Sequence, residues 1–516
     1  MATVASLALA GCANGPASPP SRVQDTDAPL ASSAARHTQV ADVLWLDRLS
    51  FGATASSSRE LARMGRRAWL DGQLRPSQES PLPSSVQALI ADMTISRTPT
   101  PELVRQLEAQ RKGSDGTLDD EQKKAAQQAY QQELSRLSRE AASRMLLRAV
   151  YSPRQVQEQM TWFWFNHFNV HQYKANLRVM VGDYEAQLHA HALGRFRELL
   201  DASVFHPAMI RYLDNEQNGA ARINENYARE LLELHTLGVD GGYAQRDVQE
   251  LARVLTGLGI NFTDDMPRIK PAQQALYQRR GMVEFNPGRH DFGDKQVLGV
   301  AVKGRGFAEI EQVLDLLARH PATARFVSRK LAQYFVSDTP PAALVERMAR
   351  RFTETDGRIA DVLRVMIDSP EFEASLGGKF KDPVHYVVSA VRLAYDHKPI
   401  LNTGPMLGWL NRLGEAPYNR QTPDGYPLDQ VAWAGPGQMN TRFEVARAVG
   451  GGSAGLFKSE GATPTERPAF PQLANPLYYD GIAPRLAPAT RQALDQAGSP
   501  QEWNALLLSS PEFMHR

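Results

Sequence analysis

Apolar residues recur along most of the chain at the three- and four-residue intervals of an α-helix. From Ala41 onward, segments such as 43–51 and 58–72 place their apolar positions on one helical face, and the second of these ends at Gly72. Period-two alternation is scarce, and only Val297–Val302 suits a short hairpin edge. The pattern therefore predicts an all-α fold, a large multi-helix single body with at most a short β-hairpin.

Changes in composition divide the chain into segments. We expect a lipoprotein-like signal, a flexible tether rich in Pro and Ser, a main helical domain carrying the motifs, and a loop-rich C-terminal helical region packed on it; the ranges are 1–12, 13–40, 41–395 and 396–516. Within the last region, long stretches rich in Gly, Pro, Asn and Tyr at 402–442 and 450–480 are predicted to be ordered loops. Loops of that length in a compact body are usually functional or disordered.

Two polar helices are also predicted from the sequence, which contains one repeated tetrapeptide. The polar helices are separated at 113–116, and the second is expected to start near Asp119. The repeated tetrapeptide is Ser-Pro-Glu-Phe, which follows a predicted apolar helix at both 369–372 and 510–513. Proline ends each helix, and we expect the phenylalanine side chain to pack into the core.

Composition narrows the classes of function. Lys plus Arg number 58 and Asp plus Glu 57, so no global field attracts nucleic acid, and we expect no nucleic-acid partner. Apolar residues at 42% and charged residues at 22% are typical of a folded globular protein. No apolar run approaches the roughly 20 residues of a membrane-spanning helix. Any membrane attachment is therefore expected to be made by an anchor.

The chain has one cysteine, Cys12, at the end of Leu9-Ala-Gly-Cys. This sequence resembles a bacterial lipobox, in which cleavage leaves a lipidated cysteine at the new N-terminus. Ala13 is not the aspartate of an inner-membrane retention signal, so we expect a periplasmic protein anchored to the outer membrane. The alternative is a chemically idle cysteine. The absence of other cysteines excludes disulfides and thiol catalysis from the mature body.

The segment 222–238 concentrates ionisable groups on a predicted helix. At 100° per residue, Asn226, Glu230 and Glu233 form one stripe beside a broad apolar face. Paired carboxylates of this kind can serve as general acid and base. The stripe could equally consist of carboxylates that pair with arginines across helices.

Other residues of the same helix have structural interpretations. Arg229 stands four residues before Glu233, a spacing that supports an ion pair. His235 falls inside the apolar face and is predicted to be a packed core histidine. Gly238 suits the C′ position. A tight connection then leads to a second helix at 247–256, so an antiparallel helical hairpin is expected.

Two other segments could converge on the stripe. The aromatic run 162–171 contains Trp164, Asn166, His167 and His171. On a helix its two histidines would share a face and could bind a metal, although the pattern lacks a zincin glutamate and packed histidines are an alternative.

The second segment is a glycine-bearing loop at 286–295 with His290 followed by Asp291. An aspartate can fix the tautomer of a histidine for acid–base work or metal binding. The alternative role of this aspartate is to stabilise a turn.

Several motifs in order resemble one family. They are Trp164-Phe-Asn-His-Phe168, Tyr212-Leu-Asp-Asn215, Asn224–Leu234, Thr236-Leu-Gly238, Asp247-Val248, His290-Asp291, His320–Ala324, Lys330-Leu331, Lys381-Asp-Pro383, Gly425-Tyr-Pro427 and Trp433. Together they look like the domain-of-unknown-function 1800 family of bacterial proteins, over about Val43 to Phe513. His235 stands where that family often has phenylalanine, which agrees with a core position.

The resemblance implies an exported, mainly helical protein without a settled reaction. It also implies a partner, because such proteins are often encoded beside a secreted sulfatase-like protein of the domain-of-unknown-function 1501 family.

Three hypotheses follow. The first is a hydrolase of an envelope or imported polymer, a glycan, with catalytic and substrate-binding candidates Glu230, Glu233, His290, Asp291, Asn166, Trp164, Asn226 and Arg229; one glutamate could instead pair with Asp291 or Asp214. The second is a metal-dependent enzyme holding a divalent metal, with ligand candidates His167, His171, Glu230, Glu233 and His290. The third is a non-catalytic scaffold or maturation partner of the sulfatase-like protein. In each case membrane contact is expected only through the lipid anchor.

Overall fold

The computed structural model describes residues 33–75, 81–114, 119–263, 265–452, 454–458 and 470–516. Over these residues the chain is mainly helical with two small antiparallel sheets, which confirms the expected fold class. No helix in these ranges has both the length and the apolar character needed to cross a membrane. Cys12, the predicted signal and residues 13–32 of the predicted tether lie outside the described residues.

The helices and strands follow one another in three groups. The first group is α1 (Ser33–Leu49), α2 (Ala55–Met64), α3 (Arg66–Gln73), α4 (Ser84–Ala91), α5 (Thr94–Arg97), α6 (Thr100–Ser114), α7 (Asp120–Tyr151), α8 (Gln155–His167), η1 (Leu177–Val179), α9 (Val181–His191), α10 (Phe196–Val204) and α11 (Pro207–Tyr212). The second is η2 (Asn215–Gln217), α12 (Asn226–Glu230), the π-helix η3 (Leu231–Thr236), α13 (Gln245–Val254), β1 (Leu258–Ile260), η4 (Pro271–Leu276), β2 (Gln278–Arg280), β3 (Val283–Phe285), η5 (Pro287–Arg289), β4 (Lys295–Val297) and β5 (Val300–Val302). The third is α14 (Phe307–Arg319), α15 (Pro321–Phe335), α16 (Ala342–Glu354), α17 (Ile359–Ile367), α18 (Pro370–Ala374), α19 (Pro383–Ala394), α20 (Gly404–Leu413), η6 (Gln430–Ala432), α21 (Pro436–Gly450), the π-helix η7 (Tyr478–Ile482), η8 (Ala483–Arg485), α22 (Pro488–Asp495) and α23 (Pro500–Leu508).

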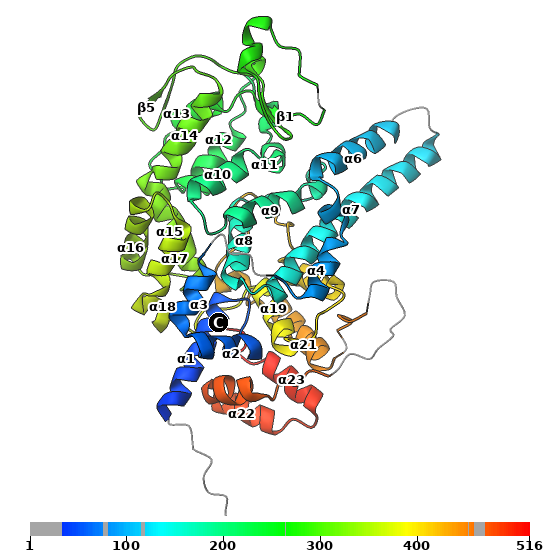
Figure 1. Cartoon of the computed structure of the whole chain (residues 1–516), viewed down its shortest axis with the longest axis vertical. Coiled ribbons are helices and arrows are strands. Elements are labelled where there is room, and N and C mark those ends of the chain that lie inside the picture. The colour runs from blue at the N-terminus through cyan, green and yellow to red at the C-terminus, as the bar shows by residue number, and fades with distance from the viewer. Residues whose placement is uncertain (1–32, 76–80, 115–118, 264, 453, 459–469) are drawn as a thin grey trace, which may run out of the picture.

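Helix α8 forms the centre of the molecule (Figure 1). All of its residues except Gln157 are buried, because the aromatic run that it carries packs against helices on several sides. Trp164 has no exposed surface, and its indole N–H donates to the carbonyl of Ala192 at 2.9 Å. The C-terminal end of this rigid helix supports the candidate site.

The N-terminal helices differ from the expected boundaries. Helix α1 begins at Ser33, so the end of the predicted tether is helical. The single helix predicted over 58–72 is wrong: α2 and α3 are separate helices, and Gly65 between them has a φ of +79°. That positive φ is accessible to glycine and lets the chain change direction, whereas Gly72, the predicted stop, lies inside α3.

The predicted pair of polar helices is confirmed. Helices α6 and α7 form a hairpin that projects from the body (Figure 1). Asp119 caps α7 by accepting from the backbone N–H of Gln122 at 2.8 Å, and the Gln122 side chain bonds back to Asp119. Residues near the tip are exposed, and α7 becomes buried only toward its C-terminal half. The charge-rich start of this helix is therefore a solvated face.

Two sheets lie together near one end of the molecule (Figure 1). The expected hairpin is confirmed as β4 and β5, with Val297 paired to Val300. Strand is scarce, as expected, but a second sheet was not predicted: β1, β3 and β2 form a three-stranded antiparallel sheet in addition to the hairpin. Each of these strands has only three residues, too few for a period-two pattern to stand out.

The repeated Ser-Pro-Glu-Phe segments behave alike. The hydroxyl of Ser369 accepts from the backbone N–H of Phe372 at 3.2 Å, and Ser510 does the same for Phe513 at 3.2 Å. Both phenylalanine side chains are buried, as predicted. The same capping geometry thus turns the chain at two places.

The chain ends inside the core. Arg516 is 1% exposed, and its guanidinium donates to the side chain of Gln159 at 2.9 Å and to the carbonyl of Tyr334 at 3.0 Å. The backbone N–H of Lys381 donates to the carbonyl of Met514 at 2.8 Å. The C-terminal region is therefore packed against α8 and α15.

A buried carboxyl pair lies where α19 meets the loop after α20. Asp382 caps α19 and also contacts the imidazole of His385 at 2.8 Å. The carboxyl of Glu415 is buried beside it and accepts from the backbone N–H of Val384 at 2.9 Å. Burial raises the pKa of Glu415 well above 4.5, and the charge of Asp382 raises it further. Glu415 is therefore the protonated member of the pair.

Replacing Glu415 by glutamine should make the protein more resistant to alkaline pH. A carboxyl whose pKa is higher in the folded than in the unfolded state stabilises the fold below its unfolded pKa, and this stability is lost as pH rises through the folded value. Glu415→Gln keeps an acceptor for Val384 and cannot ionise. In thermal melts from pH 5 to pH 9, we expect the difference between the Tm of the variant and the Tm of the parent to increase in favour of the variant as pH rises. Glu444→Gln, an exposed change on α21, is the control. Parallel Tm profiles for Glu415→Gln and the parent would contradict the assignment.

Candidate functional site

The loop after α20 is held at the end of α8 by hydrogen bonds between asparagine side chains and the backbone of the loop. The side-chain amide of Asn166 donates to the carbonyl of Tyr426 at 2.9 Å, and its oxygen accepts from the backbone N–H of Tyr426 at 2.5 Å. Asn169 donates to two further loop carbonyls at 3.0 and 2.8 Å. Between them, Gly425 lies so close to α8 that a Cβ atom would stand 2.1 Å from the carbonyl oxygen of Asn166. Asp424, which precedes Gly425 in this loop, lies near enough for its charge to act on Glu230 of α12 and on Lys330 of α15.

The predicted carboxylate helix is present in a different form. It is the short helix α12 continued by the π-helix η3, Leu231–Thr236, instead of one regular α-helix. The predicted pair between Arg229 and Glu233 is wrong: Arg229 bonds Glu225 at 3.1 Å. The i,i+4 spacing assumes 3.6 residues per turn, and the wider π-turn carries Glu233 away from that register. Glu233 instead accepts from the hydroxyl of Tyr243 at 3.2 Å.

Two carboxyl groups of the site have opposite pKa shifts. Burial raises the pKa of Glu230 above 4.5, and the negative charges of Glu233 and Asp424 add to the shift. Burial acts in the same direction on Asp424, but hydrogen bonds from Arg420 at 2.8 Å and Thr422 at 2.5 Å outweigh it and hold the pKa of Asp424 below 3.8. Glu230 therefore keeps its proton to a higher pH than Asp424 does.

Two buried histidines lie where the end of α8 meets η3, and a lysine of α15 lies near them. The rings of His167 and His235 are 6.3 Å apart, and His167 Nε2 lies 3.0 Å from the backbone carbonyl of His235. Lys330 on α15 lies 5.7 Å from the ring of Phe326, which in turn lies 6.0 Å from the ring of His167. Burial and the charge of Lys330 lower the pKa of His235 to about 3 and that of His167 well below 6.5. Both histidines are therefore neutral.

His235 is a core residue, as predicted. It has no exposed surface, and the neighbouring Gly238 has a φ of +83° that confirms its predicted C′ position. Both ring nitrogens of His235 lack a hydrogen-bond partner, as does Nδ1 of His167. Buried polar atoms are usually paired, so these nitrogens call for an explanation.

Three of the predicted substrate-binding side chains are buried or hydrogen-bonded to the backbone of the protein itself. Trp164 lies in the core and does not line an open cleft. Asn166 uses its amide to hold the loop, as described above. Asn226 donates to the carbonyl of Leu213 at 3.1 Å, although the residue is exposed. Of this group, only Asn226 and Arg229 have surface that a ligand could reach.

His290 and Asp291 do not form the expected pair. His290 is buried, with Nε2 3.0 Å from Glu309 and Nδ1 2.8 Å from the carbonyl of Thr256. Glu309 also bonds the buried ammonium of Lys295 at 2.5 Å. Asp291 bonds Arg253 at 2.7 Å instead. Both are tied into the packing between α13, α14 and the two-stranded sheet.

The expected metal pair does not share a helix face. Helix α8 ends at His167, and His171 lies in the following turn, where its ring contacts Tyr173 at 5.6 Å. The described part of the chain contains no group of three or more His, Cys, Asp or Glu side chains placed to hold a metal ion. A divalent metal stays a prediction from the sequence.

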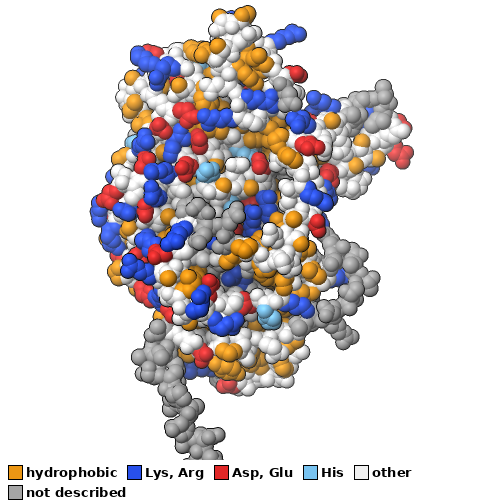
Figure 2. All heavy atoms as spheres, in the orientation of Figure 1, with side chains coloured by type: hydrophobic (Ala, Val, Ile, Leu, Met, Phe, Trp, Pro, Cys, Tyr) orange, Lys and Arg blue, Asp and Glu red, His pale blue; other side chains and the backbone are white. Residues whose placement is uncertain are grey.

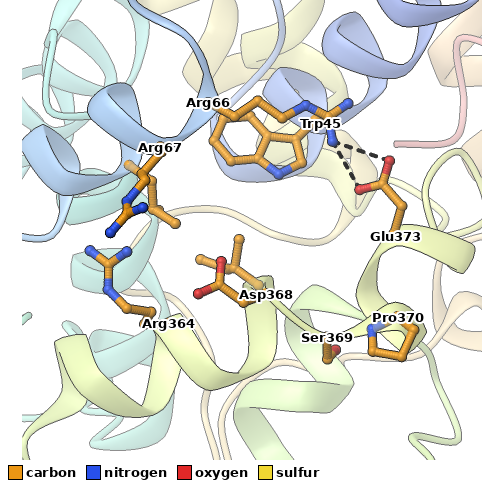
Figure 3. A pocket seen from close by; sticks show the side chains of 10 residues that line it. Trp45, Arg66, Arg67, Arg364, Asp368, Ser369, Pro370 and Glu373 are labelled. Carbon is orange, nitrogen blue, oxygen red and sulfur yellow. Dashed lines mark hydrogen bonds and ion pairs between the residues drawn. The ribbon is translucent and has the colours of Figure 1, made fainter.

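A separate groove of about 680 Å³ lies between α3 and the α17–α18 turn (Figure 3). Arg67 and Arg364 point toward one another across it. Arg66 is neutralised by Asp42 at 2.6 Å and by Glu373, and Arg364 bonds Asp71 at 2.5 Å. With its charges largely paired, the groove offers no concentrated charge for a ligand. On the face seen in Figure 2, acidic and basic side chains are likewise interspersed.

Asp424 and Lys330 were not among the predicted catalytic or metal-binding residues. Asp424 directly precedes the Gly425-Tyr-Pro motif, and Lys330 is part of a Lys-Leu motif, so both stood beside recognised signals. Asp214, the suggested partner carboxylate, instead bonds Lys174 at 2.8 Å. The prediction of one ordered loop over 402–442 is wrong in part, because α20 and the start of α21 lie within this range and only the segment between them is a loop. The length of that remaining loop was the signal that could have directed attention to Asp424.

The comparisons with known proteins give one family. The model of the family described as "Protein of unknown function (DUF1800)" matches residues 44–515. No curated protein matches the chain, and no solved structure matches it.

Proposed function

The chain belongs to the DUF1800 family, and we propose that it is a hydrolase of a polymeric glycan with an acid–base centre formed by Glu230 and Asp424. The observation that carries the proposal is the opposite shift of their two pKa values. Paired carboxyls whose environments separate their pKa values are characteristic of acid–base catalysis. Compared with the pair Glu230 and Glu233 predicted from the sequence, Asp424 replaces Glu233 as the ionised member.

In the proposed reaction, Glu230 donates its proton to the oxygen of the glycosidic bond as the bond to the anomeric carbon breaks. A water molecule adds to that carbon and passes its proton to Asp424. Transfer of that proton through solvent to Glu230 restores the starting state. Glu233, held by Tyr243, raises the pKa of Glu230 and so helps the acid to retain its proton at higher pH.

The proposed location and partner rest on the sequence. A lipid anchor on Cys12 would hold the enzyme at the periplasmic side of the outer membrane, where envelope and imported polymers are present. The sulfatase-like protein of the domain-of-unknown-function 1501 family stays a predicted partner. A sulfatase-like enzyme would remove substituents that block access to a glycan chain, which is compatible with a hydrolase acting beside it.

The test is to incubate the protein with a panel of purified glycans over a range of pH. Hydrolysis is measured as the release of new reducing ends. We expect a bell-shaped profile in the acidic range. Activity should fall at low pH as Asp424 becomes protonated, and at higher pH as Glu230 loses its proton. The absence of product from every glycan at every pH would contradict the hydrolase proposal and favour the scaffold hypothesis.

A further inference from the structure

A cavity of about 340 Å³ lies between the end of α20 and the loop that carries Asp424. Its lining is mainly polar and includes Asn411, Asn419, Arg420, Gln421 and Thr422. Asn411, Gln421 and Thr422 are exposed, so the cavity can be reached from solvent. Pockets that bind small ligands have volumes of about 300–1,000 Å³. This cavity is therefore large enough for a small molecule or for one unit of a polymer.

Side chains from other elements fix the backbone of the loop at this cavity. The amide of Asn169 donates to the carbonyls of Arg420 and Thr422 at 3.0 and 2.8 Å. The hydroxyl of Tyr212, the last residue of α11, donates to the carbonyl of Gln421 at 2.7 Å. Three successive carbonyls are thus held in place, so the wall of the cavity is formed before a ligand binds. A preformed wall reduces the entropy that binding costs.

The amide side chains of the cavity have unused hydrogen-bonding capacity. Within the ranges that the structure describes, the side chains of Asn411, Asn419 and Gln421 form no hydrogen bond with the protein. Each amide has an oxygen that accepts and an NH₂ group that donates. Such groups suit a ligand whose own groups both donate and accept, and the hydroxyls of a sugar do both.

The charge and the shape of the lining favour an uncharged ligand. Among the residues that line the cavity, Arg420 is the only charged one, and it bonds both carboxylate oxygens of Asp424, at 3.2 Å from Nε and 2.8 Å from Nη2. Its charge is therefore compensated. The ring of Tyr426 adds an apolar part to the lining, and its hydroxyl is used by the carbonyl of Ala416 at 2.8 Å. Amides beside an aromatic ring match a sugar, which has hydroxyls at its rim and C–H groups on its faces.

We propose that this cavity is a subsite for an uncharged sugar unit, whose hydroxyls bond the amides of Asn419 and Gln421. The inference rests on the proposed glycan hydrolase for its role in the reaction. Its link to the proposed base is direct, because Arg420 and Thr422 line the cavity and also bond Asp424, at 2.8 and 2.5 Å. A glycan chain bound here lies against the side chains that hold that base.

Binding of disaccharides tests the subsite without any turnover. We would titrate the full chain at pH 7 with neutral disaccharides built from glucose, galactose, mannose or N-acetylglucosamine, and with tetraglycine as a peptide that also donates and accepts. Calorimetry or saturation-transfer NMR measures the affinity. We expect at least one disaccharide to bind with a Kd of about 1 mM or below, and tetraglycine to bind at least about 10-fold more weakly. Binding of tetraglycine alone, or of none of these probes, would overturn the proposal.

Two variants and a control locate the binding. Asn419→Ala and Gln421→Ala should each lower the affinity for the preferred disaccharide about fivefold, because each removes hydrogen bonds to the ligand. Neither side chain bonds the protein, so the Tm of both variants should equal that of the parent. Gln128→Ala, an exposed change on the projecting part of α7, is the matched control and should bind as the parent does. Parental affinity in both cavity variants would refute the assignment.

Failure of the subsite can be distinguished from failure of the hydrolase. If the parent cleaves a glycan and both cavity variants cleave it with the parent's KM, the subsite is rejected and the Glu230–Asp424 centre stays in place. If a disaccharide binds and the cavity variants weaken it, while no glycan is cleaved, the subsite is supported and the hydrolase is rejected.

Discussion

Glu230→Gln should abolish cleavage of a natural glycan and leave the fold intact. Glutamine has the same shape and cannot donate a proton to the leaving oxygen. General acid catalysis contributes about 10² to 10⁴ in rate, so kcat should fall by that factor. The side chain is only partly buried and forms no ion pair with the residues that the structure describes, so the Tm should stay close to that of the parent. Release of reducing ends and thermal melts measure the two effects.

A substrate with an activated leaving group separates an acid from a structural residue. An aryl glycoside whose phenol leaves as a stable anion needs little protonation, so Glu230→Gln should retain most of its activity on that substrate. Asp424→Asn should lose activity on both substrates, because the water still lacks a base. Glu346→Gln, on the exposed side of α16, is the matched control. Equal losses of Glu230→Gln on both substrates would show that Glu230 is not the acid.

Local features of the fold could be predicted from the sequence because they depend on neighbouring residues. The start of the second polar helix near Asp119 and the C′ position of Gly238 each depend on a few adjacent positions. The position of His235 in the core also follows from helical periodicity. Each of these predictions is confirmed.

Features that depend on distant segments were missed or misplaced. The π-helix is a change of hydrogen-bond register that residue type does not reveal, and it carries Glu233 out of the register expected for a pair with Arg229, which bonds Glu225. The pairing of His290 with Glu309 joins two separate elements. The effect of the Asp424 charge on Glu230 depends on a loop almost 200 residues away folding back onto α8. Hydrophobic patterns indicate which face is buried, but they do not indicate which loop covers it.

Only part of the candidate site could be predicted from the sequence. It singled out Glu230 and the end of α8, because these lie in dense local motifs. It did not supply the partners, because Asp424 and Lys330 are common surface residue types whose roles come from the groups that tertiary structure places around them. A pKa shift is a property of that environment and cannot be read from spacing alone.

Gly425→Ala should cause a large loss of both stability and activity. Gly425 has a φ of +79°, which costs an L-residue about 1–2 kcal/mol. The added Cβ would also stand 2.1 Å from the carbonyl oxygen of Asn166, a backbone atom of the buried helix α8 that has no room to move. Together these effects should lower the free energy of unfolding by about 3–5 kcal/mol, measured by urea denaturation.

The displaced loop should also carry Asp424 away from Glu230. Gly425→Ala should therefore resemble Asp424→Asn, with activity lost on both the natural glycan and the activated glycoside under conditions where the variant is folded. Gly408→Ala is the matched control, because Gly408 lies inside α20 with no atom within 4 Å of the added Cβ. Alanine in a helix interior should raise stability by up to about 1 kcal/mol there. If Gly425→Ala kept parental stability and activity, the contact between the loop and Asn166 would not be what positions Asp424.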